Sequence, residues 1–549
     1  MPDLQDFIKK LETEFKGEMT TDLVALGKYS KDASLLEVKP QLVVFPADVV
    51  DLKFLIKTIN FFHQAGFRLP LTVRSAGTDM SGGAIGEGVV ADVNRHLTGG
   101  LKVEMGEARV LPGTFYRDFE KATLATGQIL PSYTASKNLC TVGGMVANNS
   151  GGEKTLRYGK TEDYIKSLKV IFADGKEYEV RPLNKDELNK KMTQGDYEGE
   201  IYKKIFSLIK HNQELIKKAK PKVSKNSAGY YLWNVWDGET FDLAKLIVGS
   251  QGTLAIVTDI TFKLVPVEKE TRLVAIFLPD LKLVSNLVND LLPLAPDSIE
   301  SYDEHTLKLA LKFLPAMLKI MKTKNLFKLA WGFLPELKMV LTGGLPKLVV
   351  LVEFAGADER AVEAKVAGAL AITTKYEVQA RATKNEAEAE KYWTFRRESF
   401  NLLRKHIHGR RTAPFIDDII VKPEYLPEFL PKLQAMLDEY DLLYTVAGHV
   451  GDGNFHIIPL MNMTNKKNRQ IIMDLSERVY DLVIEYNGSI TAEHNDGIIR
   501  TPFLRKMYGP EVVELFKEVK EIFDPLNIFN PGKKVGTDKA YLESHLARE

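Results

Sequence analysis

The chain has 549 residues, of which 44% are apolar and 27% are charged, the composition of an ordinary globular protein. Because this length exceeds what one hydrophobic core usually supports, we expect two or three domains. Lysine plus arginine total 74 against 73 for aspartate plus glutamate, so no overall positive field favours nucleic acid as a partner.

Cysteine content and apolar runs bound the cellular compartment. The single cysteine, Cys140, excludes an intrachain disulfide and an iron–sulfur cluster held by this chain alone. The first residues include acids and no long apolar stretch, so we expect no signal peptide. No segment approaches 18 uninterrupted apolar residues, so none is expected to span a bilayer. These features favour the cytoplasm.

The first part of the chain alternates helices and strands before two glycine-rich runs. Apolar spacing predicts, in order, a helix over 3–16, a strand over 41–45, a helix over 47–64, strands over 71–73 and 89–93, and a helix over 116–125. The strand over 71–73 leads into the first run, Arg74-Ser-Ala-Gly-Thr-Asp-Met-Ser-Gly-Gly-Ala84. The second run is Asn138-Leu-Cys-Thr-Val-Gly-Gly-Met-Val-Ala-Asn-Asn-Ser-Gly-Gly152.

The two runs have the chemistry of a pyrophosphate site. Glycines let the backbone approach a ligand, and successive backbone N–H groups in such turns form an anion-binding concavity. Neither run is the Gly-x-Gly-x-x-Gly of a Rossmann fold or a Walker loop. Two such turns in one chain predict a single dinucleotide. The alternative is that both are surface turns, since glycine is a common turn residue.

Beyond residue 160 the pattern continues into a second region. We expect a hairpin over 165–173 and 176–180, helices over much of 186–219, and a third glycine turn at 249–259 that runs into an apolar strand. Pro266 marks a domain boundary. Strands such as 271–277 and 348–354 then alternate with long helices, which is an α+β pattern suited to a cap.

Two further motifs contain possible metal ligands. In Gly448-His-Val-Gly-Asp-Gly-Asn-Phe-His-Ile457, a turn over 451–454 would place His449 opposite His456, close enough to share one metal. The run Ala492-Glu-His-Asn-Asp-Gly497 adds a carboxylate and a third histidine. The alternative is a pair of hydrogen-bonded core histidines.

Together these motifs resemble the flavin domain of the vanillyl-alcohol oxidase (PCMH) type, in the branch of FAD-linked D-2-hydroxyacid dehydrogenases. That branch includes D-lactate dehydrogenases and the FAD subunit of glycolate oxidase. The resemblance covers roughly residues 36–535 and implies an α+β fold. It implies a helical segment over 1–35, a two-part FAD-binding domain over 36–268, a substrate cap over 269–490 with a basic insertion at 305–348, and a C-terminal helical return to the FAD domain over 491–549.

FAD is the cofactor that the resemblance implies. No histidine stands in the first run, where related oxidases tether flavin, and Cys140 reads as a buried packing residue, so we expect non-covalent FAD. The family usually has Glu where this chain has Gln251. The closing motif, 523–533, also offers Lys533. The predicted FAD contacts are Arg74, Ala76, Gly77, Thr78, Asp79, Ser81, Gly82, Pro131, Thr141, Gly143, Gly144, Ala147, Asn148, Ser150, Gly151, Gly252, Thr253, Ile256, Val257 and Asn530.

The resemblance also implies a metal and a base. In the family the first two histidines and the glutamate hold a divalent metal and the adjoining histidine is the base, which assigns His449, His456 and Glu493 as ligands and His494 as base. Zn²⁺ and Mn²⁺ suit these donors, and Fe²⁺ is compatible. The metal would lower the pKa of the substrate hydroxyl while C2 gives hydride to flavin.

Substrate contacts follow from a shorter motif. The run Tyr392-Trp-Thr-Phe-Arg-Arg-Glu398 resembles the family's Leu-Trp-x-Ile-Arg, which aligns Arg396 with the arginine that binds the substrate carboxylate. Arg397 reads as a solvated helix residue, and Asn454 is a second predicted substrate contact. Hydroxyglutarate-type relatives often have Asn where this chain has Ile458, which favours a small hydroxyacid, with D-lactate the leading choice.

Several alternatives stay open. Glycolate and D-2-hydroxyglutarate are the alternative substrates. A flavin-dependent transferase of the alkylglycerone-phosphate synthase type, which has no use for a metal, is the alternative of another class. A non-catalytic flavoprotein is the third.

A lysine-rich stretch has its own interpretation. Residues 305–348 contain eight lysines against one acid, Glu336, among large apolar side chains. Such segments lie on membrane surfaces, which would place the protein on the inner face of the cytoplasmic membrane with a quinone or an electron-transfer protein as acceptor. The alternative is a cap helix pair whose lysines are simply solvated. A homodimer is a further open possibility.

Overall fold

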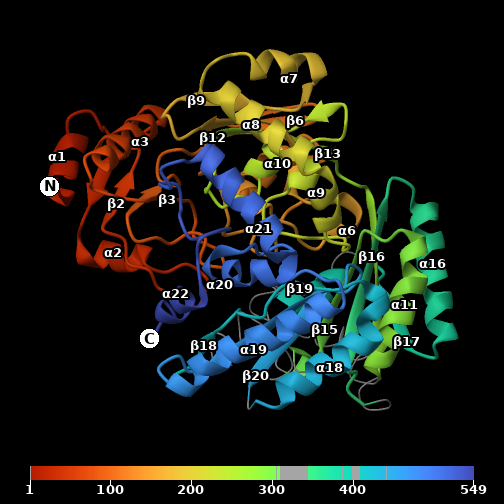
Figure 1. Cartoon of the computed structure of the whole chain (residues 1–549). Coiled ribbons are helices and arrows are strands. Elements are labelled where there is room, and N and C mark those ends of the chain that lie inside the picture. The colour runs from red at the N-terminus through yellow and green to blue at the C-terminus, as the bar shows by residue number, and fades with distance from the viewer. Residues whose placement is uncertain are drawn as a thin grey trace.

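The computed structural model describes residues 2–304, 306–308, 344–385, 388–397, 409–440 and 442–548. Most of the lysine-rich stretch therefore lies outside the described residues. Three sheets organise what is described, two in the N-terminal half and one in the C-terminal half (Figure 1). No helix in the described ranges has the length and apolar character needed to cross a membrane.

The first sheet has four strands in the order β1-β2-β4-β3. Its strands are β1 (Glu18–Thr20), β2 (Leu42–Phe45), β3 (Leu71–Arg74) and β4 (Val89–Asp92). The helices around it are α1 (Leu4–Leu11), α2 (Leu23–Tyr29) and α3 (Val49–Gln64). β2, β3 and β4 are parallel, whereas β1 pairs antiparallel with β2. Such a parallel unit needs a crossover between strands, which α3 provides.

The sequence-based expectation for the N-terminus was partly wrong. The helix predicted over 3–16 ends at Leu11. The longer segment 1–35, predicted to be helical, also contains the strand β1. Gly17 explains the change of direction, because a Cβ at this position would lie 2.0 Å from the carbonyl oxygen of Phe45. The chain can therefore pass close to β2 at this point.

The second sheet is antiparallel, with the order β5-β6-β12-β8-β9. Its strands are β5 (Lys102–Glu104), β6 (Glu107–Val110), β8 (Ile165–Ile171), β9 (Glu177–Val180) and β12 (Ile256–Lys263). Burial alternates along β12, so one face packs on a core and the other is partly solvated. Two small ladders join β7 (Gln128–Ile129) to β13 (Val265–Pro266) and β10 (Leu183–Asn184) to β11 (Thr240–Phe241). The helices are α4 (Tyr116–Leu124), α5 (Val142–Asn148), α6 (Thr155–Tyr158), α7 (Lys185–Met192), α8 (Tyr197–His211), α9 (Gln213–Ala219) and α10 (Ala244–Ile247).

The third sheet forms the cap, with the order β17-β14-β16-β15-β20-β21-β18 and β19 also paired to β21. Its strands are β14 (Glu270–Leu278), β15 (Ser298–Asp303), β16 (Leu348–Gly356), β17 (Gln379–Ala382), β18 (Arg411–Thr412), β19 (Ile419–Ile420), β20 (Leu443–His449) and β21 (Asn454–Met461). Its helices are α11 (Val284–Leu291), α16 (Glu359–Lys375), α18 (Leu426–Asp438) and α19 (Lys466–Glu485).

Both faces of the cap sheet are covered near β16. Val350 and Val352 belong to the large core that includes α11 and α16, whereas Val349 and Leu351 pack with Trp393 of the helical segment 388–397. A strand buried on both faces reads as a continuous apolar run, as 348–352 does. The helical segment that carries Arg396 is thus held against the sheet.

The end of the chain returns to the first two sheets. The C-terminal helices are α20 (Gly497–Arg500), α21 (Leu504–Phe523) and α22 (Lys539–Ser544). α21, drawn in blue in Figure 1, lies against α8 and α9 of the second sheet. Beyond it, Leu71 donates its N–H to Ile528 and Asn530 donates its own to Leu71, at 2.7 and 2.8 Å. The C-terminal segment therefore lies beside β3.

Candidate active site

The two glycine runs lie next to each other. The hydroxyl of Thr141, which caps α5, donates to the hydroxyl of Ser75 in the first run at 2.7 Å. The second run differs from expectation, because residues 142–148 form a helix instead of a turn. Val142, Met145 and Val146 have helical spacing and bury one face, a signal that the glycines obscured. The contact between the runs is nevertheless the one that a shared dinucleotide requires.

Gln251 of the third glycine turn contacts the first glycine run. Its amide nitrogen donates to Asp79 at 3.1 Å and to Ser81 at 3.0 Å, while its oxygen accepts from the N–H of Gly497 at 2.8 Å. A glutamate could not donate to the carboxylate of Asp79. The presence of Gln at position 251, where the family usually has Glu, therefore suits its hydrogen bond to Asp79.

Asn530 fastens these turns together. Its amide nitrogen donates to the carbonyl oxygens of Gly83 and Gln251 at 2.8 and 2.7 Å, and its oxygen accepts from Thr72 at 2.9 Å. Burial lowers the pKa of Lys533 to about 8 although Asp32 opposes this, and its ammonium donates to Ile85 at 2.8 Å. Asn530 and Lys533 therefore both donate hydrogen bonds to main-chain oxygens of these loops.

Other predicted FAD contacts divide into two kinds. Arg74 donates to the carbonyl oxygen of Lys31 at 2.8 Å, and Asp79 accepts from Ser81 and Gly83, so these side chains bond within the protein. The remaining predicted contacts lie on the first glycine run, in the loop after β7, on α5 and its flanks, on the turn before β12 or at the start of β12: Ala76, Gly77, Thr78, Gly82, Pro131, Gly143, Gly144, Ala147, Ser150, Gly151, Gly252, Thr253, Ile256 and Val257.

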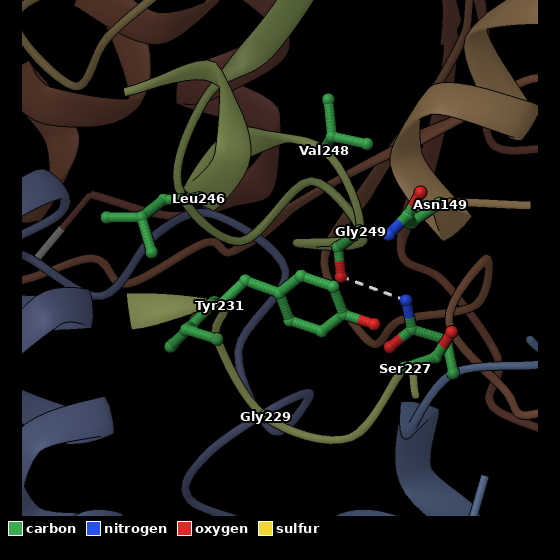
Figure 2. Close-up of a pocket in the computed structure, with 9 residues that line it drawn as sticks. Asn149, Ser227, Gly229, Tyr231, Leu246, Val248 and Gly249 are labelled. Carbon is green, nitrogen blue, oxygen red and sulfur yellow. Dashed lines mark hydrogen bonds between the residues drawn. The ribbon is translucent and has the colours of Figure 1, made fainter. Parts of the chain in front are cut away.

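The polar groups at the end of α5 fit a ligand. The side-chain oxygen of Asn148 and the amide nitrogen of Asn149 are buried, and neither has a hydrogen-bond partner among the described residues. A small pocket beside Asn149 is lined by Tyr231 and Gly249, among others (Figure 2). A dinucleotide supplies the donors and acceptors that such groups lack, so these residues fit FAD. Cys140 is 5% exposed and belongs to a hydrophobic core cluster, as expected for a packing residue.

The hairpin that carries the first two histidines has a different register from the predicted one. His449 pairs with Asn454, and His456 pairs with Ala447, so the turn spans 450–453. Gly453 has a φ of 74°, and a Cβ there would lie 1.9 Å from the carbonyl oxygen of Val421. The shift is two residues on one strand, and side chains repeat every two residues, so both histidines still share a face.

The two histidines point at one carboxylate oxygen. The Nε2 atoms of His449 and His456 lie 2.9 and 3.4 Å from Oε1 of Glu493. Their Nδ1 atoms lie 2.7 Å from Glu300 and 3.1 Å from Asp417. Metal-binding histidines usually give their second ring nitrogen to such a carboxylate, which fixes the tautomer. The donor set therefore fits a divalent metal.

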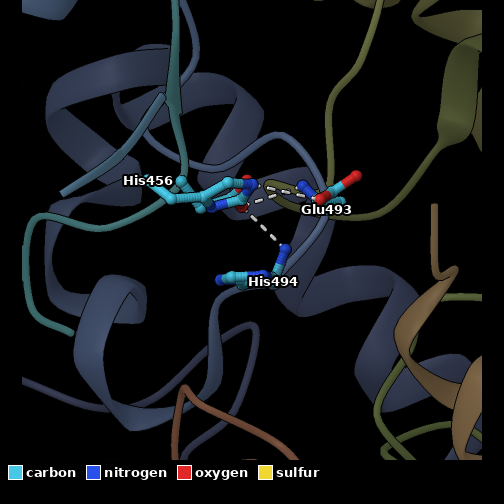
Figure 3. A group of neighbouring side chains, drawn as sticks. His456, Glu493 and His494 are labelled. Carbon is cyan, nitrogen blue, oxygen red and sulfur yellow. Dashed lines mark hydrogen bonds and ion pairs between the residues drawn. The ribbon is translucent and has the colours of Figure 1, made fainter. Parts of the chain in front are cut away.

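His494 lies beside this set. It stacks on His456 with ring centroids 4.9 Å apart (Figure 3). Its Nδ1 lies 2.7 Å from the second oxygen of Asp417. Burial opposes its charge, but Asp417 raises its pKa. In the same way burial opposes the charge of His456, but Asp417 and Glu493 raise its pKa to about 10. One carboxylate thus orients a predicted ligand and the predicted base.

A second donor set overlaps the first. Donor atoms of Asp418, His456, Glu493 and His494 all lie within 4.8 Å of one another. However, Oδ2 of Asp418 already accepts from Thr491 and from the N–H groups of Glu493 and His494, all within 2.8 Å. We favour the set with His449, because Asp418 is occupied in holding the 491–494 loop.

Buried acids outnumber permanent cations in this cluster. Ion pairs link four carboxylates to two permanent cations and three histidines: Glu300, Asp417, Asp452 and Glu493; Lys225 and Arg396; His449, His456 and His494. With neutral histidines, two negative charges are left without a partner. A buried charge is costly unless it is paired, so protons or a divalent cation must supply the balance.

The two predicted substrate residues, Arg396 and Asn454, and the neighbouring Arg397 have three different environments. Arg396 is 9% exposed and forms an ion pair with Glu300, and its Nε–H has no partner among the residues described. Arg397 is not a solvated residue as predicted, because it pairs with Glu153 and lies over the ring of Trp393. Asn454 is fully buried and donates to Asp418 and Ile419, both at 3.1 Å, so its amide nitrogen bonds inside the protein.

Hydrogen bonds connect the loop that carries Glu493 to the glycine turns. The amide nitrogen of Asn148 donates to the main-chain oxygen of Glu493 at 2.8 Å. Asn495 donates to the main-chain oxygen of Gly249 at 2.9 Å, and Lys160 donates to that of Ala492 at 2.9 Å. The predicted flavin and metal residues therefore belong to one site.

Two family models match the chain in succession. A model described as FAD binding domain matches residues 40–181, and one described as FAD linked oxidases, C-terminal domain matches residues 267–534. The chain therefore has an FAD binding domain followed by the C-terminal domain of FAD-linked oxidases. The solved structure of p-cresol methylhydroxylase with substrate bound has a TM-score of 0.69 at 15% identity, covering 97% of each chain, which shows that this chain has the predicted PCMH-type fold.

Two curated relatives are similar along most of the chain. D-2-hydroxyglutarate dehydrogenase of Escherichia coli (strain K12) is 25% identical over 540 residues, 96% of this chain and 51% of that protein. The chain thus spans about half the length of this relative. D-lactate dehydrogenase of Archaeoglobus fulgidus is 26% identical and covers 90% of this chain and 91% of its own length.

Sequence reasoning missed the acids around the ligands. Glu300, Asp417 and Asp418 are each at most 1% exposed, yet none belongs to a glycine run or a histidine motif. Their signal was acids inside apolar strand-like runs, Ser298-Ile-Glu-Ser-Tyr302 and Phe415-Ile-Asp-Asp-Ile-Ile-Val421. A buried acid requires a partner, so such runs mark candidate sites.

Proposed function

We propose that this protein is a dehydrogenase of a D-2-hydroxyacid, with D-lactate oxidised to pyruvate as the best substrate. The divalent metal would be held by His449, His456 and Glu493. The observation that carries the proposal is the convergence of these donors one hydrogen bond away from α5, through Asn148. A redox cofactor and a metal that binds a hydroxyl are the two agents that such an oxidation needs.

The chain's own residues provide orientation and proton transfer. Arg396, with an unpartnered Nε–H, binds the substrate carboxylate. His494 takes the hydroxyl proton at Nε2, because Asp417 holds its Nδ1. When bound, FAD accepts the hydride from C2, and a divalent cation lowers the pKa of the hydroxyl. The substrate thus loses one proton and one hydride and becomes the ketoacid.

The residue at position 458 bears on the size of the substrate. Ile458 is 9% exposed on the strand that carries His456 and offers no donor to a second carboxylate. We therefore place D-lactate before D-2-hydroxyglutarate and glycolate, although several relatives, including the one from Escherichia coli, bear the hydroxyglutarate name. A flavin transferase would have no use for the buried imidazoles, which favours the dehydrogenase.

The electron acceptor is proposed from the sequence alone. We infer a quinone or an electron-transfer protein, reached by peripheral contact of the lysine-rich stretch with an anionic membrane. Co-sedimentation with anionic and neutral vesicles at low and high salt tests this contact. Binding that is equal for both vesicle types, or absent from both, would contradict it.

A substrate screen under anaerobic conditions tests the enzyme proposal. The purified protein, with FAD and Mn²⁺, is mixed with D-lactate, L-lactate, glycolate or D-2-hydroxyglutarate, and flavin absorption is followed. We expect D-lactate to bleach the flavin and L-lactate to leave it oxidised. If no D-2-hydroxyacid bleaches flavin that is bound to a metal-loaded protein, the dehydrogenase proposal fails.

A further inference from the structure

Glu300 has a different charged partner for each of its oxygens. This residue of β15 is 1% exposed, and its Oε1 lies 2.7 Å from Nδ1 of His449. Its Oε2 forms an ion pair with the guanidinium of Arg396. Glu300 therefore lies between the residue proposed to bind the substrate carboxylate and a residue proposed to bind the metal.

The contact with His449 affects the metal side. A carboxylate that accepts from Nδ1 keeps the Nε2 lone pair directed at the metal position and makes the ring a stronger donor. Here Nε2 of His449 is 2.9 Å from Glu493, so the ring is held between two carboxylates. The more negative charge Glu300 directs at the ring, the better the ring binds a cation.

The contact with Arg396 affects the substrate side. The side chain of Arg396 is 6% exposed, and among the described residues it forms an ion pair with Glu300. A buried guanidinium without an anion is strongly unfavourable, so Glu300 holds Arg396 in place while no substrate is bound. When a substrate carboxylate reaches Arg396, two anions share one cation. The charge of Glu300 then becomes less compensated.

We propose that Glu300 is a positioning residue that links the substrate arginine to the metal ligand His449. Neutralising Arg396 with a substrate carboxylate strengthens the hold of His449 on the metal, and binding energy of this kind is reciprocal between the two sites. This inference rests on the proposed function. It adds that substrate and metal bind more tightly together than either does alone.

The test measures the affinity of the FAD-loaded protein for Mn²⁺ without any turnover. Arg396→Leu removes the cation that shares Glu300, so we expect tighter Mn²⁺ binding, by about tenfold. Glu300→Gln weakens the acceptor for His449, so we expect looser binding, within the roughly 10- to 100-fold typical of such partners. In the double variant we expect the affinity of Glu300→Gln, because Arg396 acts only through Glu300.

Controls separate this link from general damage. Glu353→Gln removes another buried acid of the cap sheet, paired with Lys154 at 2.8 Å, and should leave Mn²⁺ affinity unchanged. Arg396→Gln also removes the charge but keeps a polar side chain, so it replaces Arg396→Leu in the comparison if the latter does not retain FAD, with the same tighter Mn²⁺ binding expected.

Three results decide the matter. Unchanged affinity in Arg396→Leu, or single effects that multiply in the double variant, would overturn the link while the metal site stands. A natural protein that retains FAD but binds no Mn²⁺ would instead refute the proposed metal function itself.

Discussion

Asp417→Asn is the most informative change to the proposed base. Asp417 is fully buried, and its carboxylate lies 2.7 Å from Nδ1 of His494 and 3.1 Å from Nδ1 of His456. A nearby opposite charge shifts a pKa by about 1–3 units, which is about 1.4–4 kcal/mol of stabilisation of the charged histidine. Removing the charge therefore lowers the pKa of His494.

The sign of the pH effect follows from the role of His494. A base works in its neutral form, so kcat/KM falls as pH drops below its pKa. A lower pKa in Asp417→Asn moves this acidic limb toward lower pH, by about 1–3 units. The plateau also falls, because the two histidines contact different oxygens of Asp417, and asparagine replaces one of these oxygens with an NH2 group that cannot accept from a ring N–H. We expect a loss of at least about tenfold and at most the roughly 10²- to 10⁴-fold that a general base contributes.

The assay is kcat/KM for D-lactate against pH, with an artificial electron acceptor and saturating Mn²⁺. Saturation matters because the same change loosens a metal ligand. Asp452→Asn is the matched control, since the carboxylate of this buried acid contacts Lys225 at 3.2 Å and Ser224 at 2.7 Å and, among the described residues, no histidine ring. An acidic limb that stays in place or moves to higher pH in Asp417→Asn would refute the assignment of His494 as base.

Three other predictions test separate parts of the site. Alanine at a proposed metal ligand should abolish metal binding and most turnover while flavin absorbance is retained; the variants are His449→Ala, His456→Ala and Glu493→Ala. Loss of metal and flavin together in such a variant would contradict the prediction that different residues hold the metal and the flavin. Acid precipitation should release the flavin into the supernatant, whereas flavin in the pellet would show a covalent bond. Gln251→Glu places a carboxylate against Asp79, 3.1 Å from the present amide, and should lower the free energy of unfolding by about 1–3 kcal/mol in denaturant titration; an unchanged midpoint would argue against this contact.

Local patterns predicted the elements well and the spatial pairings less well. Strands over 41–45, 71–73 and 89–93 correspond to β2, β3 and β4, because short apolar runs between turn residues are a local property. The turn between β20 and β21 was misplaced, because Gly451 and Gly453 both permit a turn and the choice depends on the distant Val421. Helix α5 was missed because glycine disfavours helices, yet tertiary packing overrides that preference.

The acids of the site show the limit of local reasoning most clearly. Glu300 meets a histidine 149 residues away, and Asp417 meets His494 across 77 residues. Nothing in a single sequence states such pairings, because they arise from the order of strands in the cap sheet. What the sequence did contain was the chemical type of each group, which predicted the histidines and Glu493 that the fold brings together.

The position of Asn530 has a consequence for biosynthesis. The side chain that fastens the Gly83 and Gln251 turns comes from near the end of the chain, whereas the turns themselves are made early. Both turns are therefore synthesised long before Asn530, the residue that joins them. Stable capture of the flavin should wait until the chain has been synthesised past residue 530, so that retained yellow colour reports a chain that extends beyond Asn530.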